Sequence, residues 1–117
     1  MNKKLAIIVP YRDRRKQLDI FIPHMDSFLK DKGIDYQIII AEQRDDRPFN
    51  RGRLCNIVFN TVKDDFDYFC FHDVNLLPLT DDCDYSYPKE PTHLASFIDD
   101  EYIPYEEFIS GVFLINK

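Results

Sequence analysis

Continuous aliphatic runs mark the first strands of this chain. The runs occupy residues 5–9 and 38–41, and Tyr36 leads into the second one. Runs that are apolar at every position are typical of strands buried on both faces, as in a parallel sheet. We therefore expect a strand buried on both faces at residues 5–9 and a second aliphatic strand at residues 38–41.

Helical spacing appears between these two strands and again after the second. From Arg14 to a stop signal at Gly33, apolar residues recur every three or four positions: Leu18, Phe21, Ile22, Met25, Phe28 and Leu29. Pro23 falls inside this pattern and removes one backbone hydrogen bond near Asp19, so we expect a kink or two abutting helices. A second helix, capped by Asn50, is indicated by Leu54, Ile57, Val58 and Val62.

The second half of the chain adds three expected strands. Residues 67–71 are aromatic and apolar, and they lead into HDVN at residues 72–75. Residues 78–91 are rich in Pro, Asp and Tyr, which indicates an irregular surface segment before strands at residues 93–98 and 110–115. The alternation of strands and helices predicts an α/β fold with a mostly parallel, doubly wound sheet, whose ligands bind at the carboxyl ends of the strands. The last strand has no helix after it, so we expect a sheet that is incomplete at the C-terminus.

Size and charge restrict the kind of partner. A chain of 117 residues is the size of one domain, so we expect a single domain over residues 1–117. The net charge of -6 makes nucleic acid an unlikely ligand. Basic residues nevertheless crowd residues 12–16 and 44–53, and two local basic clusters indicate a site for a small anion.

Cysteine usage and the N-terminal segment bear on the compartment. The three cysteines lack C-x-x-C spacing, so neither a disulfide framework nor a zinc knuckle is indicated. The apolar run at residues 5–9 is too short for a signal peptide core or a membrane span. We expect a cytoplasmic protein without a membrane-spanning segment.

The loop PYRDR, residues 10–14, joins the first strand to the first helix. A helix N-terminus favours an anion, and paired N–H donors of Arg12 and Arg14 could grip diphosphate oxygens. The alternative is a solvated loop in which Asp13 caps the helix. Only three glycines occur and no glycine-rich phosphate motif is present, so this loop would have to bind through side chains.

The stretch FNR, residues 49–51, opens the second helix. An exposed Phe49 could stack on a base and Arg51 could reach a phosphate. The alternative is a helix cap at Asn50 preceded by a packing aromatic.

In HDVN, Asp73 and Asn75 face the same side of an extended strand end, with Val74 turned inward. Two oxygen ligands suit Mg²⁺ or Mn²⁺, but Asn75 offers only a neutral carbonyl oxygen, so a metal would be held weakly. A plain strand end is the alternative. His72 and His93 are expected to be hydrogen-bonded structural residues, and Cys70 to be inert packing.

An aromatic and acidic patch at residues 102–107 suits a hydroxyl-rich ligand such as a sugar, because rings cover CH faces and carboxylates accept from hydroxyl groups. The alternative is an ordinary surface loop.

Together, PYRDR, FIPHM, FNR with LCN, HDVNLLP and IPYEEFISGV occur in the order and approximate spacing of the β-1,4-galactosyltransferase family. HDVNLLPL followed by DYSYP most resembles the branch that transfers galactose to xylose on proteoglycan linkers. The resemblance covers essentially the whole chain. It implies a GT-A fold, Rossmann-like, that binds UDP-galactose with Mn²⁺ or Mg²⁺ and transfers the sugar with inversion to a glycan acceptor.

The resemblance also implies residue roles. It implies donor binding at matched positions: Arg12, Arg14, Phe49, Arg51, Asp73 and Val74. Tyr105 and Gly111 match positions near the sugar and the acceptor, and Phe108 replaces a family tyrosine. Asn75 stands where the family's aspartate-x-aspartate motif supplies a metal-bound carboxylate, next to Asp73 as a second possible ligand. The family segment with the catalytic base has no counterpart, so no base is assigned and the chain corresponds to the donor-binding N-terminal portion.

Three functions remain open from the sequence. The first is a glycosyltransferase of the β-1,4-galactosyltransferase type with a UDP-sugar donor. The second is a non-catalytic or truncated relative that binds nucleotide or glycan without turnover, which Asn75 favours. The third is an unrelated nucleotide-binding α/β protein, which would not prefer UDP over ADP.

Overall fold

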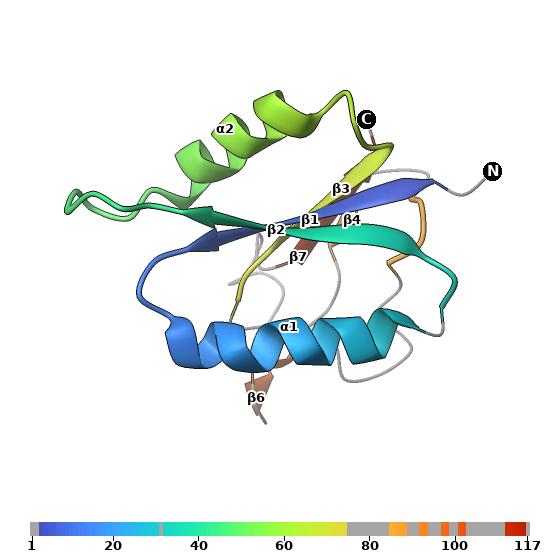
Figure 1. The fold of residues 1–117 in the computed structure, drawn as a ribbon, viewed down its shortest axis with the longest axis horizontal. Coiled ribbons are helices and arrows are strands. Elements are labelled where there is room, and N and C mark those ends of the chain that lie inside the picture. Colours follow the sequence, from blue (N-terminus) through green and yellow to red (C-terminus); the bar gives the residue numbers. More distant parts are fainter. Residues whose placement is uncertain are drawn as a thin grey trace.

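A mixed sheet between two helices forms the framework (Figure 1). The computed structural model describes residues 3–30, 32–74, 85–88, 92–93, 97–98, 101–102 and 112–116. The main sheet has the order β2-β1-β3-β7-β4, and its strands are β1 (Lys4–Tyr11), β2 (Asp35–Glu42), β3 (Tyr68–His72), β4 (Thr92–His93) and β7 (Val112–Asn116). The helices α1 (Arg15–Lys30) and α2 (Arg51–Val62) lie on opposite faces of it. A second, two-stranded sheet pairs β5 (Phe97–Ile98) with β6 (Glu101–Tyr102).

Strand direction follows the α/β expectation except at one strand. β1 pairs in parallel with β2 and with β3, so that Ile7 stands opposite Ile38 on one side and Cys70 on the other. β7 is antiparallel to both β3 and β4, which leaves β4 in the common direction. The predicted α/β fold with a mostly parallel sheet is confirmed, and the reversed β7 is an addition to it.

One predicted strand is wrong, and one of two alternatives for the first helix is excluded. Residues 93–98 do not form one strand, because Thr92–His93 pairs in the main sheet and Phe97–Ile98 pairs with β6. Two abutting helices at Pro23 are excluded, since α1 runs through this residue as one element of 16 residues, and a kink there stays a prediction. Pro23 is exposed, so its missing N–H lies on the solvent side of the helix, where water can satisfy the freed carbonyl group. None of the helices in the described ranges is long and apolar enough to cross a membrane.

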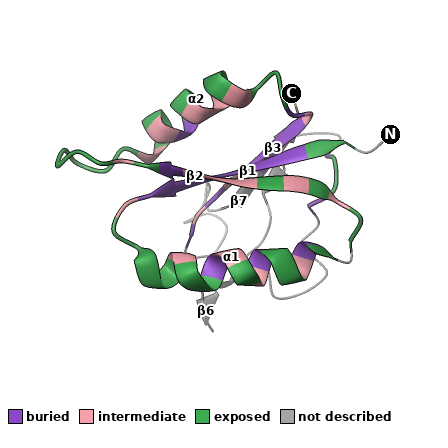
Figure 2. Cartoon of the chain, in the orientation of Figure 1, coloured by how far each residue is buried: buried purple, intermediate pink, exposed green. Residues whose placement is uncertain are grey.

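The core lies on both faces of β1, as Figure 2 shows by the buried colour along this strand. Leu5, Ile7 and Val9 point to the face that α1 covers, where they join buried residues of that helix: Phe21, Met25 and Leu29. Ala6 and Ile8 point to the opposite face and pack in a second cluster with residues from α2 and β3. Successive side chains of a strand alternate between faces, so a run without polar residues is buried on both sides.

Candidate functional site

One pocket of about 420 Å³ lies where the loops after β1, before α2 and after β3 come together. Its lining is Pro10, Arg12, Asp13, Arg14, Phe49, Arg51, Asp73 and Val74. Every residue that the sequence assigned to donor binding therefore stands at the same opening. The parallel pairing of β1 and β3 explains the convergence, because carboxyl ends of parallel strands meet at one edge of a sheet. The binding roles of these residues stay predictions.

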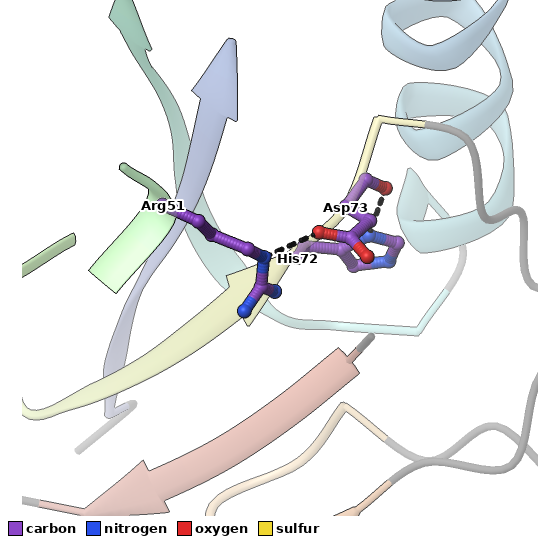
Figure 3. A network of polar contacts seen from close by, with 3 residues as sticks. All are labelled: Arg51, His72 and Asp73. Carbon is purple, nitrogen blue, oxygen red and sulfur yellow. Dashed lines mark hydrogen bonds and ion pairs between the residues drawn. The ribbon is translucent and has the colours of Figure 1, made fainter. Parts of the chain in front are cut away.

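Arg51 and Asp73 form an ion pair in this pocket (Figure 3). Arg51 Nε donates to Asp73 Oδ1 at 2.7 Å, and the two side chains are only 26% and 24% exposed. Burial raises the pKa of Asp73, while the charge and the hydrogen bond of Arg51 act in the opposite direction. The pair holds a charged carboxylate at the tip of β3, next to the first turn of α2.

His72 fixes the backbone beside this carboxylate. The ring is fully buried, Nδ1 donates to the carbonyl oxygen of Asp73 at 2.9 Å, and Nε2 accepts from the Tyr85 hydroxyl at 2.8 Å. A carbonyl group only accepts, which assigns the proton to Nδ1. Burial lowers the pKa of His72 to about 4, so the ring is neutral at pH 7. The prediction of a structural, hydrogen-bonded histidine is confirmed for His72.

Arg12 holds the loop that carries Phe49. Its Nη1 donates to the carbonyl oxygens of Asp45 at 3.2 Å and Arg47 at 2.5 Å. Its guanidinium carbon lies 5.5 Å from the centroid of the Phe49 ring, in a cation–π contact. Arg14, by contrast, is exposed, and its Nη1 donates to the carbonyl oxygen of neighbouring Asp13 at 3.0 Å. The two arginines of PYRDR therefore differ in their surroundings.

The start of α2 serves structure as well as the pocket. Asn50 is the N-cap, and its side-chain oxygen accepts from the backbone N–H of Arg53 at 3.0 Å. The predicted cap is confirmed, and it stands between the two pocket residues Phe49 and Arg51. Phe49 itself is 42% exposed, so it does not serve only as a packing aromatic. The helix-cap interpretation of FNR and the pocket interpretation hold together.

No role was predicted for Gln43 or Tyr85. Gln43 contacts four groups of the loop at residues 45–50 through its side-chain amide. Gln43 directly follows β2. Ligands of such sheets bind beyond the carboxyl ends of the strands, so this position could have identified Gln43 as a candidate site residue. Tyr85 lies in a segment interpreted as irregular, yet it is buried and bonded to His72.

Several predicted residues lie outside the described residues: Asn75, Tyr105 and Gly111. The side chain of His93 is also outside them. Cys70 is fully buried as a free thiol, and burial raises its pKa, in agreement with inert packing.

One side chain of the pocket has the chemistry of a ligand to a divalent metal. Asp73 is its one carboxylate that is anchored by an ion pair, and the described residues contain no group of three or more His, Cys, Asp and Glu side chains that could hold an ion. Mg²⁺ is commonly bound through one or two carboxylates together with substrate phosphates. The donor set therefore fits a metal whose remaining ligands come from the nucleotide and from other residues.

Comparison with known proteins places the chain in a family. A family model described as the N-terminal region of glycosyl transferase group 7 matches residues 1–88. β-1,4-Galactosyltransferase 7 of Drosophila melanogaster is 40% identical over 116 residues, which cover 97% of this chain and 36% of that protein. The chain belongs to the β-1,4-galactosyltransferase family. The xylosylprotein 4-beta-galactosyltransferase of Caenorhabditis elegans is 37% identical over 118 residues, covering 96% of this chain and 40% of that protein.

Solved structures agree with this family assignment. The catalytic domain of Drosophila β-1,4-galactosyltransferase 7, in complex with xylobiose, matches with a TM-score of 0.85 and 37% identity over 97% of this chain and 49% of that chain. A mutant of the same enzyme was solved with manganese, UDP-Gal and xylobiose. A glycosyltransferase involved in the glycosylation of the major capsid of PBCV-1 matches with a TM-score of 0.51 at 13% identity, which bears on the fold alone. The fold is the predicted GT-A fold, and the chain spans about half or less of each galactosyltransferase named above.

Proposed function

We propose that this chain is the donor-binding portion of an inverting galactosyltransferase, which takes UDP-galactose and transfers the sugar to a hydroxyl group of a glycan acceptor. The observation that carries the proposal is the single pocket that gathers Arg12, Arg14, Phe49, Arg51 and Asp73. Relatives that share this fold and 37% of the sequence are galactosyltransferases, and one was solved with UDP-Gal and xylobiose.

The pocket has the chemistry that a nucleoside diphosphate needs. Arginines outnumber carboxylates in its lining, so it attracts an anion. Arg14 is exposed and can turn its planar guanidinium to phosphate oxygens, which it can bind in pairs. Phe49 presents a ring face for a flat base, because its side chain is 42% exposed at the pocket wall.

Asp73 and Asn75 are the residues of this chain that would hold Mn²⁺ or Mg²⁺. A bound divalent ion would neutralise charge that builds on the departing diphosphate. The neutral amide oxygen of Asn75 would hold the ion less tightly than a carboxylate. Asn75 in place of the family's carboxylate favours the second candidate, a relative that binds nucleotide or glycan without turnover. The cytoplasmic location stays a prediction.

Titration with nucleotides tests the donor site. UDP is expected to bind more tightly than ADP, and Arg14→Ala is expected to weaken UDP binding by about tenfold, because a charged hydrogen bond to phosphate contributes about 1.5–3 kcal/mol. The matched control is Arg15→Ala, which removes a neighbouring arginine whose partner is Asp19 on α1. Equal affinities for UDP and ADP would contradict the proposal and favour an unrelated nucleotide-binding protein. Release of galactose from UDP-galactose separates the enzyme from the non-catalytic relative.

The metal is tested by Asn75→Asp. A carboxylate at this position is expected to tighten Mn²⁺ binding in the presence of UDP, since it adds a charged oxygen ligand. Manganese titrations of both forms, followed by calorimetry, measure the change. Superimposable curves would remove Asn75 from the proposed site.

A further inference from the structure

The loop at residues 43–50 is the wall between two pockets. On one side Phe49 lines the pocket that contains Asp73, and on the other side lies a second pocket of about 490 Å³. The lining of this second pocket includes Gln43, Asp45, Arg47 and Pro48. Residues 44–50 are all exposed, so hydrophobic burial does not hold the loop in place. Its polar contacts must therefore decide where the Phe49 ring stands.

Gln43 makes most of these contacts. Its Nε2 donates to Asp45 Oδ1 at 2.9 Å and to the carbonyl oxygens of Pro48 at 3.1 Å and Arg47 at 3.2 Å, while its Oε1 accepts from the backbone N–H of Asn50 at 2.9 Å. The side chain thus uses both its donors and its acceptor on one loop. Its own backbone N–H donates to the carbonyl oxygen of Tyr11 at 3.0 Å, at the end of β1. Gln43 is therefore an anchored point from which the loop is shaped.

Arg12 braces the loop from the side of the first pocket. The carbonyl oxygen of Arg47 accepts from both Arg12 and Gln43, so the two side chains meet at one backbone group. With its Nη1 bonded to two loop carbonyl groups, Arg12 keeps its guanidinium beside the Phe49 ring. This arrangement gives Arg12 a supporting role for Phe49, in addition to the diphosphate contact that the sequence predicted.

We propose that Gln43 is a positioning residue for the nucleotide base, acting through the loop that carries Phe49. The inference rests on the proposed function, because it requires a nucleotide in the pocket that Phe49 and Asp73 line. A loop that is ordered before the ligand arrives does not have to be ordered on binding, so affinity for the base is higher. At the diphosphate end of the pocket, Arg14 bonds to Asp13 and Arg51 to Asp73, so this end depends on the loop only through Arg12.

The experiment compares two probes, UDP and inorganic pyrophosphate, by calorimetry. Gln43→Ala is expected to weaken UDP binding by about tenfold, the equivalent of one or two net hydrogen bonds, and to change pyrophosphate binding by less than about twofold. Gln37→Ala is the matched control, since it removes an exposed glutamine of β2, the strand that directly precedes Gln43. Thermal unfolding of each variant verifies that the core is intact.

A second pair of variants tests the mechanism. Gln43→Glu keeps the length and the acceptor but loses both N–H donors and faces the Asp45 carboxylate, so UDP binding falls. Adding Asp45→Asn returns a donor to this contact and is expected to recover part of the loss.

Three results would overturn the inference in different ways. If UDP and pyrophosphate lose affinity equally in Gln43→Ala, the residue is merely structural. If Gln43→Ala binds UDP as tightly as the wild-type protein does, and the wild-type protein prefers UDP over ADP, Gln43 has no positioning role and the proposed function stands. If the wild-type protein binds neither probe, the proposed function itself fails and the inference fails with it.

Discussion

Arg51 and Asp73 depend on each other, because either one alone would leave a charge in a place with little water. Their side chains are 26% and 24% exposed, which lies between a surface pair and a buried one. Arg51→Met and Asp73→Asn are each expected to lower the free energy of unfolding by about 1–3 kcal/mol, with a coupling of about 1–2 kcal/mol in the double variant. Urea unfolding without nucleotide measures all four proteins.

The Arg15–Asp19 pair on α1 is the control for this cycle, since its side chains are 80% and 62% exposed. Its coupling is expected to stay below about 0.5 kcal/mol. A coupling at Arg51 and Asp73 as small as this one would mean that the pair contributes nothing to the pocket before a ligand binds.

Tyr36 supplies a pH dependence that can be isolated. Its hydroxyl donates to Asp26 Oδ1 at 2.5 Å, and burial, followed by this hydrogen bond and the charge of Asp26, raises the pKa of Tyr36 from 10.0 to about 12. The folded protein therefore holds this proton more tightly than the unfolded chain. The stabilising contribution is complete below pH 10.0 and is lost as the pH rises toward about 12.

Tyr36→Phe removes this titration and leaves all other ionisable groups in place. The difference in stability between the wild type and Tyr36→Phe is expected to shrink from pH 9 to about pH 12, as measured by urea unfolding. A constant difference over that range would show that folding does not raise the pKa of Tyr36.

At the scale of elements, the cap of α2 is separable from the pocket residues beside it. Asn50 accepts from the N–H of Arg53 through its side chain, so Asn50→Ala leaves that donor unsatisfied. Loss of a helix cap is expected to cost about 1 kcal/mol of stability in thermal or urea unfolding, and Asn50→Asp to cost little, because aspartate caps equally well. Equal losses for the two variants would indicate a role for the amide group other than capping.

The elements that the sequence predicted are those decided by local pattern. The apolar run of β1 is buried on both faces, the run of β2 is partly buried at the edge of the sheet, and Asn50 caps α2 through a neighbour three positions away. The bracing of the loop at residues 43–50 was missed, because Arg12 reaches carbonyl groups 33 and 35 positions away. Contacts over such distances exist only after β1 and β2 have paired.

For the whole molecule, strand direction was the weak point of the sequence prediction. An apolar segment at residues 110–115 predicts a strand but contains no information on its orientation, and β7 runs against β3. The convergence of pocket residues could be predicted, since it follows from the parallel pairing of the first strands alone. The site is thus more predictable than the edge of the sheet that β7 and β4 complete.

β7 is expected to be an integral part of the core and not an edge that can be removed. Leu114 stands opposite Cys70, is 1% exposed, and belongs to the same cluster as Leu5, Tyr68 and Phe21. Leu114→Ala is expected to lower the free energy of unfolding by about 2–4 kcal/mol, because it opens a cavity under α1. Urea unfolding measures this loss.

Ile115 is the control within the same strand, because its side chain is only partly buried and packs on the opposite face, in the cluster with Phe69. Ile115→Ala is therefore expected to cost less than Leu114→Ala. Similar, small losses for both would mean that β7 pairs with β3 without closing the core. In that case α1 would be packed only by the three parallel strands β1, β2 and β3, and these strands alone would position the pocket residues that precede α1.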